Sequence, residues 1–170
     1  MTARLLVAGV GNVFLGDDGF GVEVVRRLST REFPDWARVA DYGIRGMHLA
    51  YDLVSGEYAT TVLVDAAARG ERPGTVSVVE LDPPDRPDDT ATVLDAHGMQ
   101  PDVVLGLVAL LGGDPGRVLL VGCEPAVLDQ GMGLSPPVAA AVDLAVTAVT
   151  DIIREHEPDR PAVPVGREQV

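Results

Sequence analysis

The chain has 170 residues, of which 46% are apolar, so the composition excludes global disorder and predicts one domain with its own core. Aromatic residues make up only 4%, so we expect that core to be built mainly from Val, Leu and Ala. The formal net charge of −13 argues against binding to nucleic acid or to anionic lipid, because both of these partners are negatively charged.

Three further features bear on where the protein works. No uninterrupted apolar run approaches the roughly 20 residues that span a bilayer. The first residues lack the layout of a signal peptide, because the apolar stretch breaks at Gly9 and Gly11. The single cysteine, Cys123, excludes an internal disulfide and a CxxC metal site. We therefore expect a cytoplasmic protein with no membrane partner.

Apolar runs, helical spacing and turn residues predict strands and helices in alternation. The predicted strands cover residues 4–10, 37–41, 60–65, 75–81 and 117–123. The predicted helices cover residues 17–30, 47–54, 101–111 and 136–155. The last helix should be capped by Ser135 and begin at Pro136.

This alternation predicts an α/β fold, a three-layer sandwich with helices on both faces of a five-stranded, twisted, mostly parallel sheet. Only residues 66–74 separate the third strand from the fourth, which is too short for a parallel crossover. We therefore expect the fourth strand to run antiparallel to the third. The prediction is one domain over residues 1–157, followed by a flexible tail at 158–170.

The glycines after the first strand invite comparison with a dinucleotide-binding loop. Gly9 and Gly11 fit that pattern, but Phe14 stands where its third glycine would be. Asp17 and Asp18 also occupy the helix start that a pyrophosphate would need. The same two carboxylates suit a cation, so the sequence favours a metal over a nucleotide.

Three potential metal ligands lie far apart in the sequence. Asp18 follows the first strand, Asp65 ends the third, and the carboxyl ends of parallel strands are where ligands bind in such sheets. His97 lies in the long loop 82–100, which could carry it over the same crevice. Two carboxylates and an imidazole would suit Ni²⁺ or Zn²⁺. From spacing alone, helix capping by Asp18 and an exposed loop position for His97 remain open alternatives.

Other reactive side chains have ordinary explanations as well. Cys123 is either a buried core thiol or a nucleophile that pairs with His97. His48 and His156 are better explained as exposed or structural residues. Arg45 could reach the rim of the crevice or lie on the surface.

The motifs together resemble the nickel–iron hydrogenase maturation proteases, endopeptidases that trim the C-terminal tail of a hydrogenase large subunit. The likeness covers roughly residues 4–150. It is carried by Gly9-Val10-Gly11-Asn12, Asp17-Asp18-Gly19, Gly21, Val64-Asp65-Ala66, the His97 loop, Gly122-Cys123-Glu124-Pro125 and Gly133-Leu134-Ser135.

The resemblance implies roles for particular residues of this chain. Its metal-binding trio falls on Asp18, Asp65 and His97, with Asp18 and Asp65 also as the catalytic acids. Its glycine-rich segment after the second strand places Asp41, Gly43 and Arg45 at the substrate, although Tyr42 and Ile44 depart from the common form. That departure bears on which class of hydrogenase is processed.

The implied partner is a large-subunit precursor that arrives with nickel already inserted, and zinc or cadmium could replace that nickel in crystals. The precursor would be cut after the nickel is sensed, and the isolated enzyme, expected to be a monomer, would hold almost no metal. A competing hypothesis is a metal-sensing chaperone that docks on the precursor without cutting it.

Overall fold

The computed structural model describes residues 4–82 and 100–158. Five strands in this part of the chain form one sheet in the order β2-β1-β3-β5-β4. Their bounds are β1 (Leu5–Val10), β2 (Ala37–Gly43), β3 (Thr60–Ala66), β4 (Val76–Leu81) and β5 (Arg117–Cys123). All neighbouring pairs are parallel except β4 with β5, so the sheet confirms the predicted mostly parallel arrangement.

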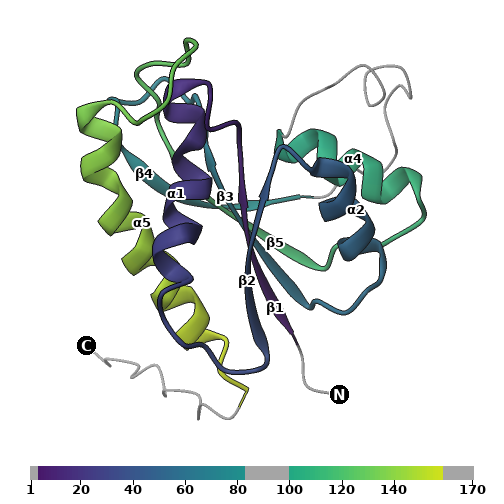
Figure 1. Cartoon of the computed structure of the whole chain (residues 1–170). Helices are drawn as coiled ribbons and strands as arrows, with labels where there is room; N and C mark the ends of the chain where they lie inside the picture. Colours follow the sequence, from purple (N-terminus) through teal and green to yellow (C-terminus); the bar gives the residue numbers. More distant parts are fainter. Residues whose placement is uncertain (1–3, 83–99, 159–170) are drawn as a thin grey trace, which may run out of the picture.

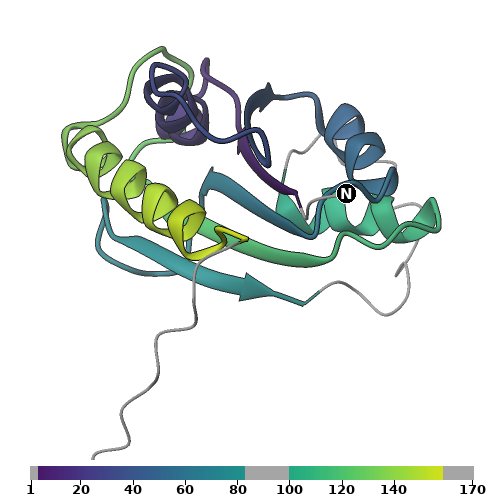
Figure 2. The same cartoon turned by 90° about the horizontal axis from the view of Figure 1, so that it is seen from below.

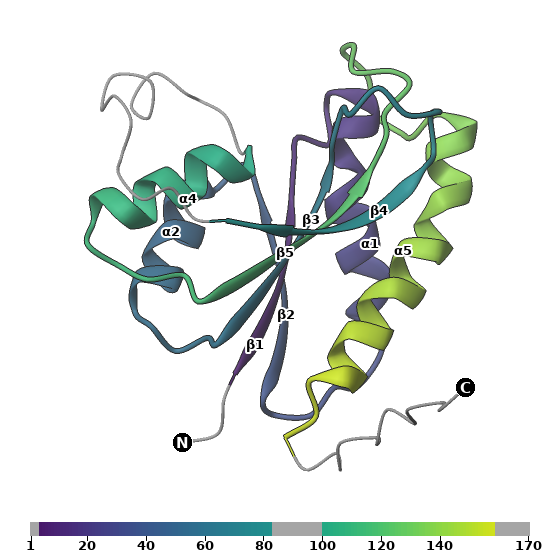
Figure 3. The same ribbon diagram turned by 180° about the vertical axis from the view of Figure 1, so that it is seen from behind.

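Helices cover both faces of the sheet, which confirms the three layers (Figures 1 and 2). One face carries α1 (Phe20–Leu28) and α5 (Pro136–Glu155). The other face carries α2 (Gly46–Val54) and α4 (Pro101–Leu110). Figure 3 shows the same two pairs of helices from behind.

Alternating side chains of β1 supply both cores. Leu5 and Val7 pack among α1 and α5, whereas Leu6 and Ala8 pack among α2 and α4. Because both faces are covered, every residue of β1 is buried, and the strand reads as a continuous apolar run. Burial of each such Leu or Val contributes about 1.5–3 kcal/mol.

The fourth strand lies at the edge of the sheet. It runs opposite to β3, as predicted, but it pairs with β5 rather than with β3. Leu81, the last residue of β4, is opposite Val118 near the start of β5. The chain therefore leaves β4 at the end of the sheet opposite to the carboxyl ends of the parallel strands.

The predicted helix 17–30 was wrong in its first turn. A short 3₁₀ helix, Gly16–Gly19, precedes α1, which begins only at Phe20. The predicted start of α5 at Pro136 is confirmed, and Ser135 is its N-cap residue. The Ser135 side chain does not cap the helix, however, because its hydroxyl donates a hydrogen bond to Asp17 instead.

By length and composition alone, α5 is long and apolar enough to cross a membrane. In this fold it lies along the sheet beside α1, and Val138, Val142 and Val149 are fully buried in the core. Arg27 of α1 also forms an ion pair with Asp143 of α5, with 2.6 Å between Nη1 and Oδ1. The apolar composition of α5 is therefore explained by its packing as a core helix.

Candidate active site

The glycines of the opening motif allow α1 to lie directly on the sheet. A Cβ atom at Gly21 would come within 2.0 Å of the carbonyl oxygen of Val64, and one at Gly9 within 2.6 Å of the carbonyl oxygen of Gly21. No side chain fits at either contact. The signature thus serves a close helix–sheet approach rather than a phosphate, and it brings the start of α1 to the end of β3.

Gly11 continues this close approach toward the two acids. Its φ of +132° lies in a region that favours glycine, and a Cβ there would meet the backbone oxygen of Asp18 at 1.9 Å. The same Cβ would lie 3.6 Å from Oδ1 of Asp65. Gly11 therefore lies against the backbone of Asp18 and beside the carboxylate of Asp65, and a side chain at this position would clash with the backbone of Asp18.

Asp65 is a buried acid with an unsatisfied oxygen. It is 5% exposed, it pairs with Gly122 in β5, and its Oδ1 has no hydrogen-bond partner among the described residues. Burial, followed by the negative charge of Asp18, raises the pKa of the Asp65 carboxyl to about 8. Near neutral pH, Asp65 therefore holds a proton that it can release to a nearby base or in exchange for a cation.

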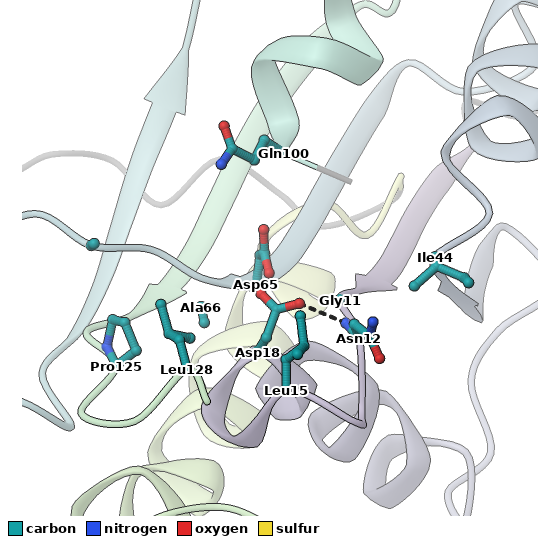
Figure 4. A pocket seen from close by; sticks show the side chains of 11 residues that line it. Gly11, Asn12, Leu15, Asp18, Ile44, Asp65, Ala66, Gln100, Pro125 and Leu128 are labelled. Carbon is teal, nitrogen blue, oxygen red and sulfur yellow. Dashed lines mark hydrogen bonds between the residues drawn. The ribbon is translucent and has the colours of Figure 1, made fainter. Parts of the chain in front are cut away.

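Asp18 faces Asp65 from the 3₁₀ helix. Its Oδ2 accepts a hydrogen bond of 2.7 Å from the backbone N–H of Asn12, which fixes the direction of the carboxylate (Figure 4). The two acids line one cavity of about 290 Å³. The predicted convergence of Asp18 and Asp65 on one crevice is therefore what the structure shows.

The walls of this cavity, which we call the acid pocket, come from widely separated segments. Ile44 and Leu128 flank the acids, and Gln100 approaches from the start of α4 (Figure 4). The remaining lining residues are Gly11, Asn12, Leu15, Ala66, Ala68 and Pro125. The pocket therefore presents two carboxylates at its base within a largely apolar wall.

Asp17, the neighbour of Asp18, has a different environment. It is fully buried, and its carboxylate accepts hydrogen bonds from the N–H groups of Ala126, Val127 and Ser135 and from the Ser135 hydroxyl. Burial would raise the pKa of Asp17, but these four donors outweigh it and lower that pKa. Asp17 is thus held as an anion by the loop between β5 and α5.

The backbone of the 3₁₀ segment joins the same loop. Gly16 donates to the carbonyl of Gly131, and Gly131 donates to that of Phe14, while the Asp17 N–H donates to Val127. A Cβ at Gly16 would lie 2.6 Å from the carbonyl oxygen of Val127, so glycine is required there. These backbone hydrogen bonds therefore hold residues 14–17 and 126–135 together beside the acid pocket.

Sequence reasoning missed the role of Asp17. The sequence shows the pair Asp17-Asp18, but residues that are adjacent on a helical turn point in different directions. Only one of them can face the crevice, and the sequence does not say which. The donors to Asp17 are Ala126, Val127 and Ser135, and of these only Ser135 carries a side chain that could have signalled a hydrogen bond to a buried acid.

The residues predicted to bind substrate lie beside the acid pocket. Asp41, Gly43 and Arg45 line a second cavity of about 280 Å³, which shares Gly11, Asn12 and Ile44 with the first. Arg45 turns back onto its own segment, where it donates to the backbone oxygens of Tyr42 and Asp41. A substrate role for these three residues stays a prediction.

His97, the third predicted metal ligand, lies outside the described residues. Within residues 4–82 and 100–158, no group of three or more His, Cys, Asp or Glu side chains could hold a metal ion. Gln100, three residues after His97 in the sequence, lines the acid pocket. The donor set that the structure places together is therefore two carboxylates, one of them with a free oxygen.

The nucleophilic alternative for Cys123 is not supported. Its thiol is fully buried in the core beneath α5, and burial, followed by the charges of Asp17 and Glu124, raises its pKa to about 11. A reactive cysteine needs the opposite, an exposed thiol with a lowered pKa. His48 is exposed on α2, and the His156 ring contacts the backbone oxygen of Ile152 in α5.

Comparison with known proteins identifies the family. A family model described as hydrogenase maturation protease, HycI, matches residues 22–152. The chain is 31% identical to the hydrogenase 2 maturation protease of Escherichia coli, over 89% of this chain and 92% of that protein. It is 35% identical to the hydrogenase expression/formation protein HupD of Rhodobacter capsulatus, over 89% of this chain and 71% of that protein.

Solved structures agree with the sequence matches. The hydrogenase maturating endopeptidase HybD of Escherichia coli superposes with a TM-score of 0.69 at 31% identity, over 89% of this chain and 93% of that chain. A solution structure of an endopeptidase from the same organism gives a TM-score of 0.73 at 30% identity, over the same shares. This chain belongs to the hydrogenase maturation protease family and is an endopeptidase of that family.

Proposed function

We propose that this endopeptidase removes the C-terminal peptide of a nickel–iron hydrogenase large-subunit precursor after nickel insertion, and that Asp18, Asp65 and His97 recognise the nickel. Family membership supports the reaction class. The observation that carries the site assignment is the buried, unpartnered Oδ1 of Asp65 opposite Asp18 in the acid pocket. A buried oxygen without a donor is rare in proteins and is suited to a ligand.

The acid pair fits a cation carried by the substrate. Two carboxylates held close together repel each other, and a divalent ion between them would relieve that repulsion. Such an ion supplies positive charge that can polarise the scissile carbonyl or lower the pKa of a water molecule. Since nickel belongs to the precursor, a precursor without it would leave Asp65 protonated and the acids without their partner.

The two acids can also accept and donate the protons that are transferred during peptide hydrolysis. Water attack on a carbonyl needs a base, and departure of the amine needs an acid. Asp65, with a pKa of about 8, holds a proton near neutral pH and accepts one again after losing it. Asp18, fixed by Asn12, is the neighbouring carboxylate within the same pocket. Either acid can act as the general base.

The test compares nickel-loaded and nickel-free precursor and follows the mass of the large subunit with time. We expect shortening of the loaded precursor only. His97→Ala should abolish this shortening, whereas His48→Ala, a matched change at an exposed histidine on α2, should keep it. Equal cleavage of both precursors would refute nickel recognition, and binding without shortening would support the competing chaperone hypothesis.

We also propose that the enzyme is a cytoplasmic monomer that is nearly metal-free when purified alone. The open, two-carboxylate pocket supports the last point, because the described residues offer few ligands for permanent metal binding. Metal analysis and sedimentation of the purified protein test these statements. A stoichiometric bound metal or a stable dimer would contradict them.

A further inference from the structure

An apolar surface borders the acid pocket on the side of the loop between β5 and α5. We define the apolar rim as four exposed residues: Phe14, Val127, Leu128 and Met132, which are 62%, 44%, 50% and 74% exposed. Leu128 also lines the acid pocket, so the rim continues directly into the proposed site. Large apolar side chains gathered at such exposures mark interaction surfaces in soluble proteins.

The rim is held in place before any partner arrives. Asp17 binds the N–H groups of Ala126 and Val127, and Gly131 exchanges hydrogen bonds with Phe14 and Gly16. The loop therefore presents Val127, Leu128 and Met132 from a fixed backbone. A surface that is ordered in advance loses less conformational entropy when it binds.

From these features we infer that the apolar rim is the docking surface for the precursor, and that it fits an apolar protein surface that surrounds a cationic centre. The inference rests on the proposed function, since it takes the precursor as the occupant. Two observations favour this partner: the rim is continuous with the acid pocket, and the carboxylates of Asp18 and Asp65 at the base of that pocket complement a positive charge. Apolar contacts then contribute affinity, while the two acids recognise the positive charge of the precursor.

The test uses Met132→Ser, with Leu144→Ser as the matched control. Leu144 is an apolar side chain on α5 that is 63% exposed and lines neither cavity of the site. Both variants should fold, because neither side chain is buried. For Met132→Ser we expect KM for nickel-loaded precursor to rise about tenfold, the scale of truncating one interface side chain that contributes to binding, with the loss in kcat/KM carried by KM. Leu144→Ser should keep the KM of the unmodified enzyme.

Binding to nickel-free precursor, measured by biolayer interferometry, separates this inference from the proposed function because it needs no cleavage. Met132→Ser and Leu128→Ser should weaken that binding, and Leu144→Ser should not. Unchanged binding and KM in both rim variants would overturn the inference, as would an equal loss in the control. A shift of the enzyme from dimer to monomer without loss of precursor binding would assign the rim to self-association instead.

Discussion

Replacement of Asp65 by Asn tests the physical basis of the acid pocket. The Asp65 carboxyl has a pKa of about 8 in the folded protein, against an ordinary value of 3.8. Between these values, the folded protein holds a proton that the unfolded chain releases. Rising pH therefore favours the unfolded chain. Asn has nearly the same shape and no such proton, so Asp65→Asn should remove this dependence.

The size of the effect follows from the two pKa values. The free energy of unfolding should fall by about 1.4 kcal/mol for each pH unit between about pH 4 and pH 8 because of this one group. At pH 7, the cost in stability amounts to about 4 kcal/mol, and at pH 5 to about 2 kcal/mol. Asp65→Asn should therefore be more stable than the unmodified protein, by an amount that grows with pH, and it should not process the precursor.

The assay is urea unfolding at pH 5, 6, 7 and 8 with a chelator present. Asp151→Asn, at an exposed acid on α5, removes one charge without changing a buried site and serves as the control. We expect its stability to follow that of the unmodified protein. Parallel pH profiles for Asp65→Asn and the unmodified protein, or a less stable Asn variant, would show that burial beside Asp18 does not hold the proton on Asp65.

Three further predictions follow from the structure. Asp17→Asn should lower the free energy of unfolding by about 3 kcal/mol, because it removes a charge held by four donors, and hydrogen exchange should increase in residues 124–135. Since the pKa of Asp17 is lowered, its stabilisation is present above its unfolded pKa and is lost as the pH falls through the folded value, so the variant should flatten the acid limb of the stability curve. Gly21→Ala should cost about 3 kcal/mol or more by urea unfolding, since its Cβ would lie 2.0 Å from the oxygen of Val64; an unchanged stability would contradict that contact. Iodoacetamide should leave the native enzyme active and alkylate Cys123 only in urea, and rapid loss of activity would contradict its burial.

The fold could be predicted from the sequence because its central strands β1, β3 and β5 are buried on both sides. Continuous apolar runs such as Leu5–Val10 have no other stable location in a chain of this composition. The direction of β4 followed from the short connection before it. Its partner did not, because connection length fixes orientation but not whether β5 lies between β3 and β4.

The site was predicted in part for a similar reason. Strand ends in a parallel sheet share one edge, so Asp65 and a residue just after β1 were expected to meet. The sequence does not predict that Asp17 is bound by the loop while Asp18 lines the pocket. Which acid is bound depends on where the N–H groups of residues 124–135 lie in the fold. That contact spans more than a hundred residues of sequence and carries no local pattern.

Asp17 and Asp65 together show that the fold can satisfy a buried carboxylate and does so at only one of the two. Both acids are almost inaccessible to solvent, yet Asp17 has four donors, whereas Oδ1 of Asp65 has none among the described residues. Burial raises the pKa of both acids, but four donors outweigh it at Asp17, whereas the charge of Asp18 adds to it at Asp65, so the two pKa values move in opposite directions. The backbone N–H of Ala66 donates a hydrogen bond to the Asp65 carboxylate, but a further donor aimed at Oδ1 would have occupied the position that is open to a ligand. The unpartnered Oδ1 of Asp65 is therefore the feature on which its proposed role depends.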